Sequence, residues 1–269
     1  MPLAVCATPI GNLEDVTLRV LRELAEADLV LCEDTRHTRG LLERHGIRAR
    51  LQSYHRHNEA ARVGELLPRL EAGERIALVS DAGLPGINDP GAKLIAAAVE
   101  AGLPVTVLPG PSAVETALVA SGLAAERFLF VGYLPRREKA LAELWRKLGS
   151  SADPVVAFES PQRLPATLRS LAAALPERRV AVCRELTKRF EEVARGTAAE
   201  LVERFSAAPK GEVTLVLGGG VVKADESIAL GAVKELVGAG VPRRQAADVV
   251  ARLLSLSRNT LYEESLQSG

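Results

Sequence analysis

Short runs of apolar residues alternate, over the first 110 residues, with longer segments in which apolar residues recur every three or four positions. Four or five consecutive apolar residues between turn signals are typical of a buried strand, and the longer recurrence predicts an amphipathic helix. We expect strands at residues 3–7, 29–32, 51–53, 76–79 and 105–108, and helices at residues 17–27, 35–44, 60–71 and 89–100. Such a series predicts an α/β fold with a mostly parallel sheet covered by helices on both faces.

A second series of strands and helices follows Pro109-Gly110-Pro111. We expect its helices at residues 112–121, 137–150, 163–174 and 197–205, and its strands at residues 128–132, 155–159, 179–184, 191–196 and 213–217. The later strands follow one another with little helix between them, which predicts antiparallel pairs in this half.

The last part of the chain changes character after the triple glycine 218–220. Together with Lys223-Ala-Asp-Glu, these glycines predict a linker. Helices are expected beyond about residue 228, including 242–254 and 258–264, and a Ser-rich turn separates these two. That outline is typical of a helix-turn-helix that contacts nucleic acid, and equally of a small helical cap on the second domain. The expected domains are therefore 1–112, 113–220 and 221–269.

Composition narrows the classes of function. The 269 residues are 47% hydrophobic and carry a formal net charge of zero, so no global field draws the protein to nucleic acid, and contact with RNA needs a local basic patch. No apolar run reaches the roughly 20 residues that span a bilayer, and the start of the chain is unlike a signal peptide, so a cytoplasmic protein is expected. Cys6, Cys32 and Cys183 lie in apolar runs, which predicts buried thiols without a disulfide framework or zinc spacing.

The segment VSDAGLPGINDPG at residues 79–91 lies between a predicted strand and a predicted helix. Its glycines and prolines allow the backbone to approach a ligand closely, and ligands bind at the carboxyl ends of strands in open α/β sheets. The alternative is an ordinary turn in which Asp89 caps the helix and Pro90 takes its first position.

All four histidines lie between residues 37 and 57. His45 precedes Gly46 at a predicted helix end, where a structural role is expected. His37, His55 and His57 occur with Arg, Asn and carboxylates in the segments EDTRHT and SYHRHNE, a mixture that favours binding of a phosphate-bearing substrate and proton transfer. Two alternatives stay open, a metal site formed by His55 and His57 with Glu59 or Asp34, and solvated loops without a role.

Charged residues also gather after the strand at 179–184, in the segment CRELTKRFEE. Arg184 and Lys188 stand at the carboxyl edge of that strand, either in a substrate site or in a plain charged turn. No G-x-S-x-G elbow, reactive Cys-His arrangement or Walker lysine occurs in the sequence. Chemistry supplied by an activated cofactor, with the protein providing proximity and a base, is compatible with that absence.

The segments ATPIGNLED, EDTRHT, SYHRHNE, LVSDAGLPGINDPG, VTVLPGPSA, RELTKRFEE and KGEVTLVL together resemble one family over residues 8–262. It is the bacterial family that methylates a cytidine 2′-hydroxyl of 16S rRNA in the small ribosomal subunit, within the tetrapyrrole methylase superfamily. The resemblance implies two α/β domains of tetrapyrrole methylase type with a cofactor cleft between them, a C-terminal helical segment and a homodimer. TPIGN replaces the G-x-G-P-G-D type segment of tetrapyrrole-modifying relatives, which favours the RNA enzyme.

The resemblance also assigns residues to roles. S-adenosyl-L-methionine is expected at Pro9, Ser80, Asp81, Ala82, Gly83, Ile87, Pro109, Ser112, Ala113, Phe158, Leu186 and Val213, and no metal is expected. Contacts with RNA are expected at Asn12, Arg36, Arg56, Asn58, Arg184 and Lys188. We expect that His57, Glu59 or the Asp34 and His37 pair orients or deprotonates the 2′-hydroxyl. The alternatives are a tetrapyrrole C-methyltransferase of the same fold and a nonenzymatic RNA-binding or assembly factor.

Overall fold

The structure, a computed structural model, describes residues 2–220, 226–254 and 256–267. The chain divides into two compact units, one formed by the residues up to Trp145 together with Asp153–Gly219, the other by Arg146–Ala152 with the residues from Gly220 on. The first unit contains both five-stranded sheets, and the second contains the C-terminal helices.

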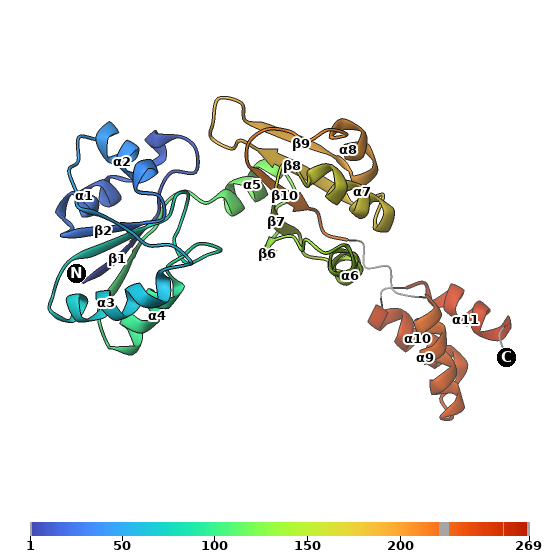
Figure 1. The fold of residues 1–269 in the computed structure, drawn as a ribbon. Coiled ribbons are helices and arrows are strands. Elements are labelled where there is room, and N and C mark those ends of the chain that lie inside the picture. Colours follow the sequence, from blue (N-terminus) through green and yellow to red (C-terminus); the bar gives the residue numbers. More distant parts are fainter. Residues whose placement is uncertain (1, 221–225, 255, 268–269) are drawn as a thin grey trace. The chain divides into compact units, whose positions relative to one another are not determined.

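The first sheet, which belongs to the blue and green part of the ribbon in Figure 1, is parallel throughout. Its strand order is β3-β2-β4-β1-β5. Its strands are β1 Leu3–Cys6, β2 Leu29–Cys32, β3 Leu51–Ser53, β4 Ile76–Val79 and β5 Val105–Leu108. Its helices are α1 Leu18–Glu26, α2 Thr35–Arg44, α3 Glu59–Glu71 and α4 Ala92–Glu100. These bounds lie within one residue of the predicted ones, except at the start of α4.

Alternate residues of each strand enter two separate cores, one on each face of this sheet. Ala4 and Cys6 pack with the apolar residues of α1 and α2, whereas Leu3 and Val5 pack with those of α3 and α4. The predicted sheet covered on both faces is thereby confirmed, and its loops at the strand ends are the parts left open to ligands.

Side chains at the predicted helix starts satisfy the first backbone N–H groups. The Thr17 hydroxyl accepts from the N–H of Val20, and the Asp34 carboxylate accepts from the N–H of Arg36. A short 3-10 helix, η1 Leu13–Asp15, was not predicted, and Asn12 caps it in the same way. At the other end of α2, His45 is the C-cap and precedes Gly46, whose φ is 67°, as its predicted structural role requires.

The expected start of α4 at residue 89 is wrong. The helix begins at Ala92 with Gly91 as N-cap, so Asp89 is not the capping residue and Pro90 is not the first helical residue. Gly91 has φ 133°, and a Cβ there would lie 2.8 Å from Cδ2 of Leu78. The chain therefore turns into the helix at a position that only glycine accommodates, two residues after Asp89.

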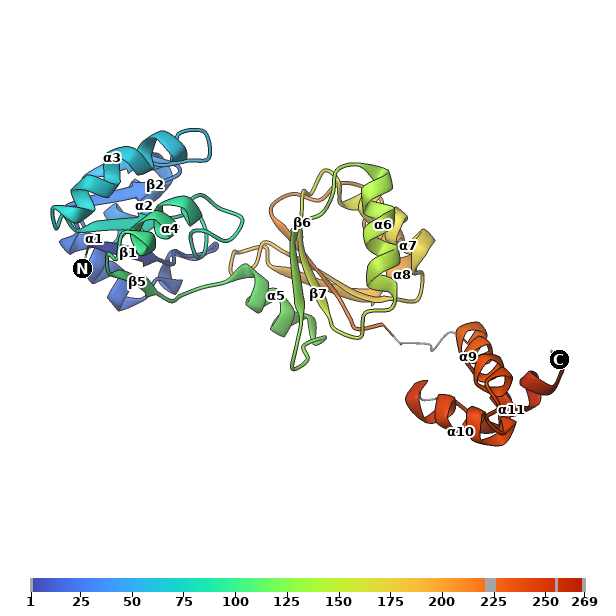
Figure 2. The same ribbon diagram turned by 90° about the horizontal axis from the view of Figure 1, so that it is seen from below.

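The second sheet is mixed, with the order β6-β7-β10-β8-β9, in which only β6 and β7 pair in parallel. Its strands are β6 Leu129–Tyr133, β7 Val155–Glu159, β8 Arg179–Arg184, β9 Glu192–Thr197 and β10 Val213–Leu217. Helix α5 Ala113–Ser121 packs on one face, and α6 Glu138–Gly149, α7 Leu164–Ala174 and α8 Ala198–Arg204 lie across the other (Figure 2). The predicted antiparallel pairs are confirmed.

Buried cysteines occur in both sheets, as predicted, and all three thiols are free. Burial raises the pKa of Cys6 and of Cys183 to about 12, so both stay protonated and unreactive at neutral pH.

The C-terminal helices are α9 Glu226–Gly238, α10 Arg243–Leu254 and α11 Arg258–Gln267. They share a core of their own, to which Val233, Val250 and Leu261 contribute, and Arg243 donates a hydrogen bond to the carbonyl of Ser265. The predicted linker at Lys223 lies outside the described residues. None of the helices described here has the length and apolar character needed to cross a membrane.

The fold predicts a large stability effect at Leu168, which is fully buried in α7. Leu168→Ala removes buried methyl groups and leaves a cavity, so the free energy of unfolding should fall by about 2–5 kcal/mol. Trp145, the only tryptophan of the sequence, is buried in α6, and its Nε1 donates to Oγ of Ser170, which lies on α7 like Leu168. Its fluorescence during denaturant titration therefore reports the loss of stability. Arg169 is the exposed chain neighbour of Leu168, and Arg169→Ala is the control, which should change the free energy of unfolding by about 0.5 kcal/mol or less. An unchanged denaturation midpoint for Leu168→Ala would contradict the packing described.

Candidate functional site

The loop between β4 and α4, residues 80–91, is tied at its start to the end of β1. Thr8 and Gly83 exchange backbone hydrogen bonds of 2.9 and 3.0 Å, and the Thr8 hydroxyl also donates to the carbonyl of Ser80 at 3.0 Å. The Ser80 hydroxyl donates within the loop, to the carbonyl of Gly83 at 3.1 Å. Ser80, predicted to contact a cofactor, is buried, and its hydrogen bond stabilises the start of the loop.

The end of the same loop is held by Glu59, the first residue of α3. Its Oε1 accepts from the N–H of Gly91 at 2.9 Å and from the Tyr54 hydroxyl at 3.3 Å, and its Oε2 lies 3.4 Å from Nζ of Lys93. Burial disfavours the charged form, but the hydrogen bonds from Gly91 and Lys93 outweigh it and place the pKa of Glu59 below its ordinary value. A carboxylate with both oxygens engaged and a lowered pKa is suited to positioning the loop and is a weak base.

A cavity of about 780 Å³ is lined in part by this loop, and we call it the main cavity. Residues of the first sheet's loops line it together with the first turn of α5, residues of β6, β7, β8 and β10, and residues next to these strands. Nine of the predicted cofactor residues belong to its wall, namely Ala82, Gly83, Ile87, Pro109, Ser112, Ala113, Phe158, Leu186 and Val213. Pro9, Ser80 and Asp81 do not line it.

The loop between β5 and α5 approaches β1 so closely that a side chain is excluded. A Cβ at Gly110 would lie 2.9 Å from Cβ of Ala7. Ser112 ends the loop as N-cap of α5, and its hydroxyl accepts from the N–H of Glu115. The cavity wall is therefore formed here by backbone and by the start of a helix.

Aromatic rings form the part of the wall that belongs to the second sheet. Phe158 contacts Phe130 and Tyr133, with ring centroids 5.1 and 5.5 Å apart. Phe130 and Tyr133 were not predicted, because the spacing of β6 residues says nothing about which cavity they face. The apolar wall suits a flat, weakly polar group of a ligand.

Three carboxylates from two chain segments interact electrostatically near the main cavity, and we call Glu33, Asp81 and Asp89 the acidic group. Asp89 lines the cavity, and its pKa is raised to about 6 by burial and by the charges of Glu33 and Asp81, against the lowering effect of Arg56. Burial and Asp81 also raise the pKa of Glu33. Asp81 accepts from the N–H of Asp34 at 3.1 Å, which links the group to the start of α2.

The histidine-bearing loop 54–58 reaches the main cavity through Arg56. The guanidinium of Arg56 donates to the carbonyl of Asn88, which lines the cavity and has a left-handed φ of 62°. Asn58 is occupied within its own loop, because its Oδ1 accepts from the N–H of His55 at 2.8 Å and its Nδ2 donates to the carbonyl of Ser53. His57 is exposed beside His55, with ring centroids 5.9 Å apart.

Asp34, His37 and Asn12 do not line the main cavity, and Pro9 is buried. Asp34 caps α2 and pairs with Arg36 at 3.5 Å, and His37 and Asn12 are exposed. Within the part of the chain that the structure describes, no three His, Cys, Asp or Glu side chains come together so that they could hold a metal ion. The alternative metal site at His55 and His57 therefore lacks a third ligand.

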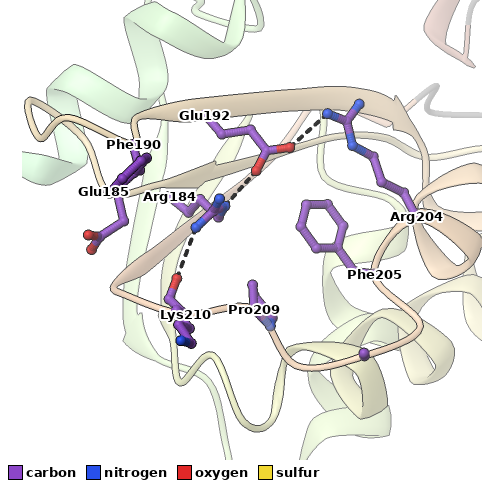
Figure 3. A pocket seen from close by; sticks show the side chains of 9 residues that line it. Arg184, Glu185, Phe190, Glu192, Arg204, Phe205, Pro209 and Lys210 are labelled. Atoms are coloured by element: carbon purple, nitrogen blue, oxygen red, sulfur yellow. Dashed lines mark hydrogen bonds and ion pairs between the residues drawn. The ribbon is translucent and has the colours of Figure 1, made fainter.

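Arg184 lies in a second, more open pocket of about 510 Å³ (Figure 3). Glu192 stands between Arg184 and Arg204 in this view and accepts from both, at 2.5 and 2.7 Å, while Arg184 also donates to the carbonyl of Lys210. Lys188 pairs with Glu185 and Glu212 at 3.0 and 2.9 Å. Both predicted substrate contacts therefore have carboxylate partners within the protein, and neither lines the main cavity.

The family model of tetrapyrrole (corrin/porphyrin) methylases matches residues 2–202. Proteins named ribosomal RNA small subunit methyltransferase I are similar over 98% of the chain. The proteins from Mesorhizobium japonicum and Synechocystis sp. are each 42% identical to this chain, and the one from Escherichia coli O157:H7 is 40% identical. The matches cover 91%, 97% and 94% of the lengths of these three relatives, in that order.

Solved structures share the fold at lower identity. Uroporphyrin-III-C-methyltransferase from Thermus thermophilus is 23% identical with a TM-score of 0.55, and the match covers 80% of this chain and 93% of that one. Diphthine synthase is 17% identical with a TM-score of 0.61, covering 80% and 89%. A further match to the Thermus enzyme, 20% identical with a TM-score of 0.54 and covering 80% and 96%, is a complex with S-adenosyl homocysteine.

The relatives named for ribosomal RNA thus extend across α9, α10 and α11, beyond the end of the family model at residue 202. The fold, the cavity at the strand ends and the full-length similarity agree: the chain belongs to the tetrapyrrole (corrin/porphyrin) methylases and, among them, to the group of ribosomal RNA small subunit methyltransferase I proteins.

Proposed function

We propose that this protein is an enzyme that transfers the methyl group of S-adenosyl-L-methionine to the ribose 2′-hydroxyl of a cytidine in 16S rRNA of the small ribosomal subunit. The observation that carries the proposal is the similarity to ribosomal RNA small subunit methyltransferase I proteins over 98% of the chain, C-terminal helices included. The choice of the 2′-oxygen and of cytidine rests on the family resemblance of the loops after β2, β3 and β4.

The main cavity fits such a methyl donor in size and in the kind of groups that line it. Its volume of about 780 Å³ lies within the range of small-molecule sites. The close approach of Gly110 to Ala7 and the backbone of Gly83 leave a cradle without side chains for the polar part of the donor. Phe158, Leu186 and Val213 offer an apolar surface to its adenine, and when bound the donor supplies an electrophilic methyl group on sulfur.

The acceptor side is assigned to the loops after β2 and β3. Arg36 and Arg56 are exposed cations beside His37 and His57, so they can contact the phosphates that flank the target ribose. Asn12 is exposed on the loop after β1 and can reach the same RNA. In this proposal Glu59 and Asn58 act by positioning, because their polar atoms already have partners.

The three expected domains take separate roles. Residues 1–112 carry the donor and acceptor loops, and residues 113–220 complete the donor site with apolar groups. Residues 221–269 add an RNA contact, for which exposed Arg244 and Arg252 are candidates. We further propose a homodimer in the cytoplasm, where ribosomal subunits are found; exposed Val107 and Leu129, on the edge strands β5 and β6, suit such an association.

Gly110→Ala should weaken donor binding, because the added Cβ would lie 2.9 Å from Ala7 and must displace the loop. We expect the Kd for S-adenosyl-L-methionine to rise about tenfold or more, measured by isothermal titration calorimetry. Gly64→Ala in α3 is the matched control, since no atom other than those of its chain neighbours and its own helix backbone lies within 4 Å of its Cβ position. Equal donor affinity in both variants would contradict the assignment of this loop.

Labelled methyl transfer to small ribosomal subunits that lack the modification should place the label on a ribose oxygen. After alkaline hydrolysis the label should appear in a dinucleotide, because a 2′-O-methyl group removes the internal nucleophile that cleaves RNA. Label released wholly as mononucleotides would refute 2′-O-methylation. Transfer to a tetrapyrrole in place of the subunit would support the C-methyltransferase alternative.

Replacement of both His37 and His57 by Ala should reduce kcat/KM for the ribosomal substrate by about tenfold or more, because both exposed imidazoles belong to the acceptor loops. Donor affinity should remain unchanged in the same protein. His45→Ala is the control, since His45 is the C-cap of α2 and is not among the residues proposed to contact RNA. A double variant with the wild-type rate would remove these histidines from the acceptor site.

A further inference from the structure

Four carboxylates line the main cavity, and they differ in how far they are engaged. Glu159 accepts from the N–H of Ser160 and from the Thr167 hydroxyl, and Glu212 pairs with Lys188. Glu115 is exposed in the first turn of α5. Asp89 is only partly exposed, and no hydrogen bond to its carboxylate is found among the described residues. It is the one of the four that is both shielded from bulk water and free to bond a substrate.

Asp89 also lies where the acceptor loop meets the cavity. The carbonyl of Asn88, its chain neighbour, accepts the hydrogen bond from Arg56. The side chain of Asn88 lies against β6, because a Cβ at Gly132 would be 2.8 Å from its Oδ1. Tyr133 is close enough for the charge of Asp89 to raise its pKa, although burial has the larger effect. Asp89 is therefore held between the segment proposed to bind RNA and the wall of the donor site.

The charged groups around Asp89 come from several elements. Glu33 follows β2, Asp81 follows β4, Arg56 belongs to the loop after β3, and Tyr133 ends β6. Burial and the two neighbouring carboxylates raise the pKa of Asp89 to about 6, whereas Arg56 acts in the opposite direction. A carboxylate of this kind holds a proton more strongly than an ordinary aspartate, yet it is mostly ionised at neutral pH, which suits a general base.

We propose that Asp89 is the catalytic residue that accepts the proton of the ribose 2′-hydroxyl, an inference that rests on the proposed function. The 2′-oxygen forms a bond to the methyl carbon as the carbon–sulfur bond breaks, and the electron pair of that bond stays on sulfur. The hydroxyl proton passes to a carboxylate oxygen of Asp89 and afterwards to solvent. The positive charge of the sulfonium is thereby discharged, and no other reactant is consumed.

Asp89→Asn retains the shape of the side chain and removes its basicity. At neutral pH and with saturating donor and ribosomal subunits, kcat should fall by about 100-fold or more. The Kd for S-adenosyl-L-methionine, measured by calorimetry, should change by less than about threefold. Asp28→Asn is the matched control at the opposite edge of the first sheet, where the amide oxygen can still accept from the N–H of Arg75, and it should keep the wild-type rate.

The dependence on pH gives an independent measurement. Because only the ionised form accepts a proton, kcat of the wild-type protein should fall as the pH drops below about 6 and level off above it. The residual activity of Asp89→Asn should lack this inflection. In protein labelled with ¹³C-aspartate and free of donor, one carboxyl resonance should titrate near pH 6 and be missing from the variant.

Two results would overturn the assignment. One is an Asp89→Asn protein that keeps the wild-type kcat and its pH inflection. The other is a variant whose loss of rate disappears at saturating donor, which would make Asp89 a donor-binding residue. A wild-type protein that binds the donor but adds no methyl to the 2′-oxygen would overturn the proposed function itself. Failure of the proposed function is distinguishable from failure of the Asp89 assignment, because the carboxyl titration of Asp89 is measured without donor or RNA.

Discussion

The hydrogen bond from the backbone N–H of Gly91 to the buried carboxylate of Glu59 is the contact on which the cavity wall depends. It fixes the far end of the loop after β4, while Thr8 fixes its near end by backbone pairing with Gly83. A buried carboxylate without donors would cost several kcal/mol, so α3 and the loop hold each other in place. Asn88 and Asp89 lie between these two attachments, and their position is therefore set by the fold.

Most of the fold was predictable because several of its strands are unbroken apolar runs that end abruptly in polar residues. Leu29–Cys32 is followed by Glu-Asp-Thr, and Ile76–Val79 by Ser-Asp, so strand ends and loops could be read directly. The start of α4 could not, because Asp-Pro is a common way to begin a helix. The hydrogen bond between Glu59 and Gly91 joins residues 32 positions apart, and a local pattern cannot express such a contact.

In the candidate site, too, residues with a local sequence signal were predictable, and residues defined by distant contacts were not. Gly83, Pro109 and Ser112 belong to Gly- and Pro-rich loops with a strong sequence signal, and they do line the cavity. The raised pKa of Asp89 had no such signal, because it arises from burial and from the charges of Glu33, at the end of another strand, and of Asp81, eight residues away in the same loop. For Glu59 the sequence and the structure favour different roles. Its place beside histidines predicted a catalytic residue, whereas its hydrogen-bond partners in the fold favour a positioning role.

A parallel sheet covered on both faces leaves its carboxyl edge as the place where a ligand can reach several strands at once. Here that edge is divided by the kind of group it offers. The proposed donor part is made of backbone and apolar side chains, which would recognise the donor whatever the acceptor is. The proposed acceptor part consists of side chains on the loops after β2 and β3, including Arg36, Arg56 and His57. Under this proposal, a change of those loops would alter what receives the methyl group without disturbing the donor site, and one fold could then serve different acceptors. In a chain of zero net charge, such local cations also have to supply the attraction for phosphate that the whole molecule lacks.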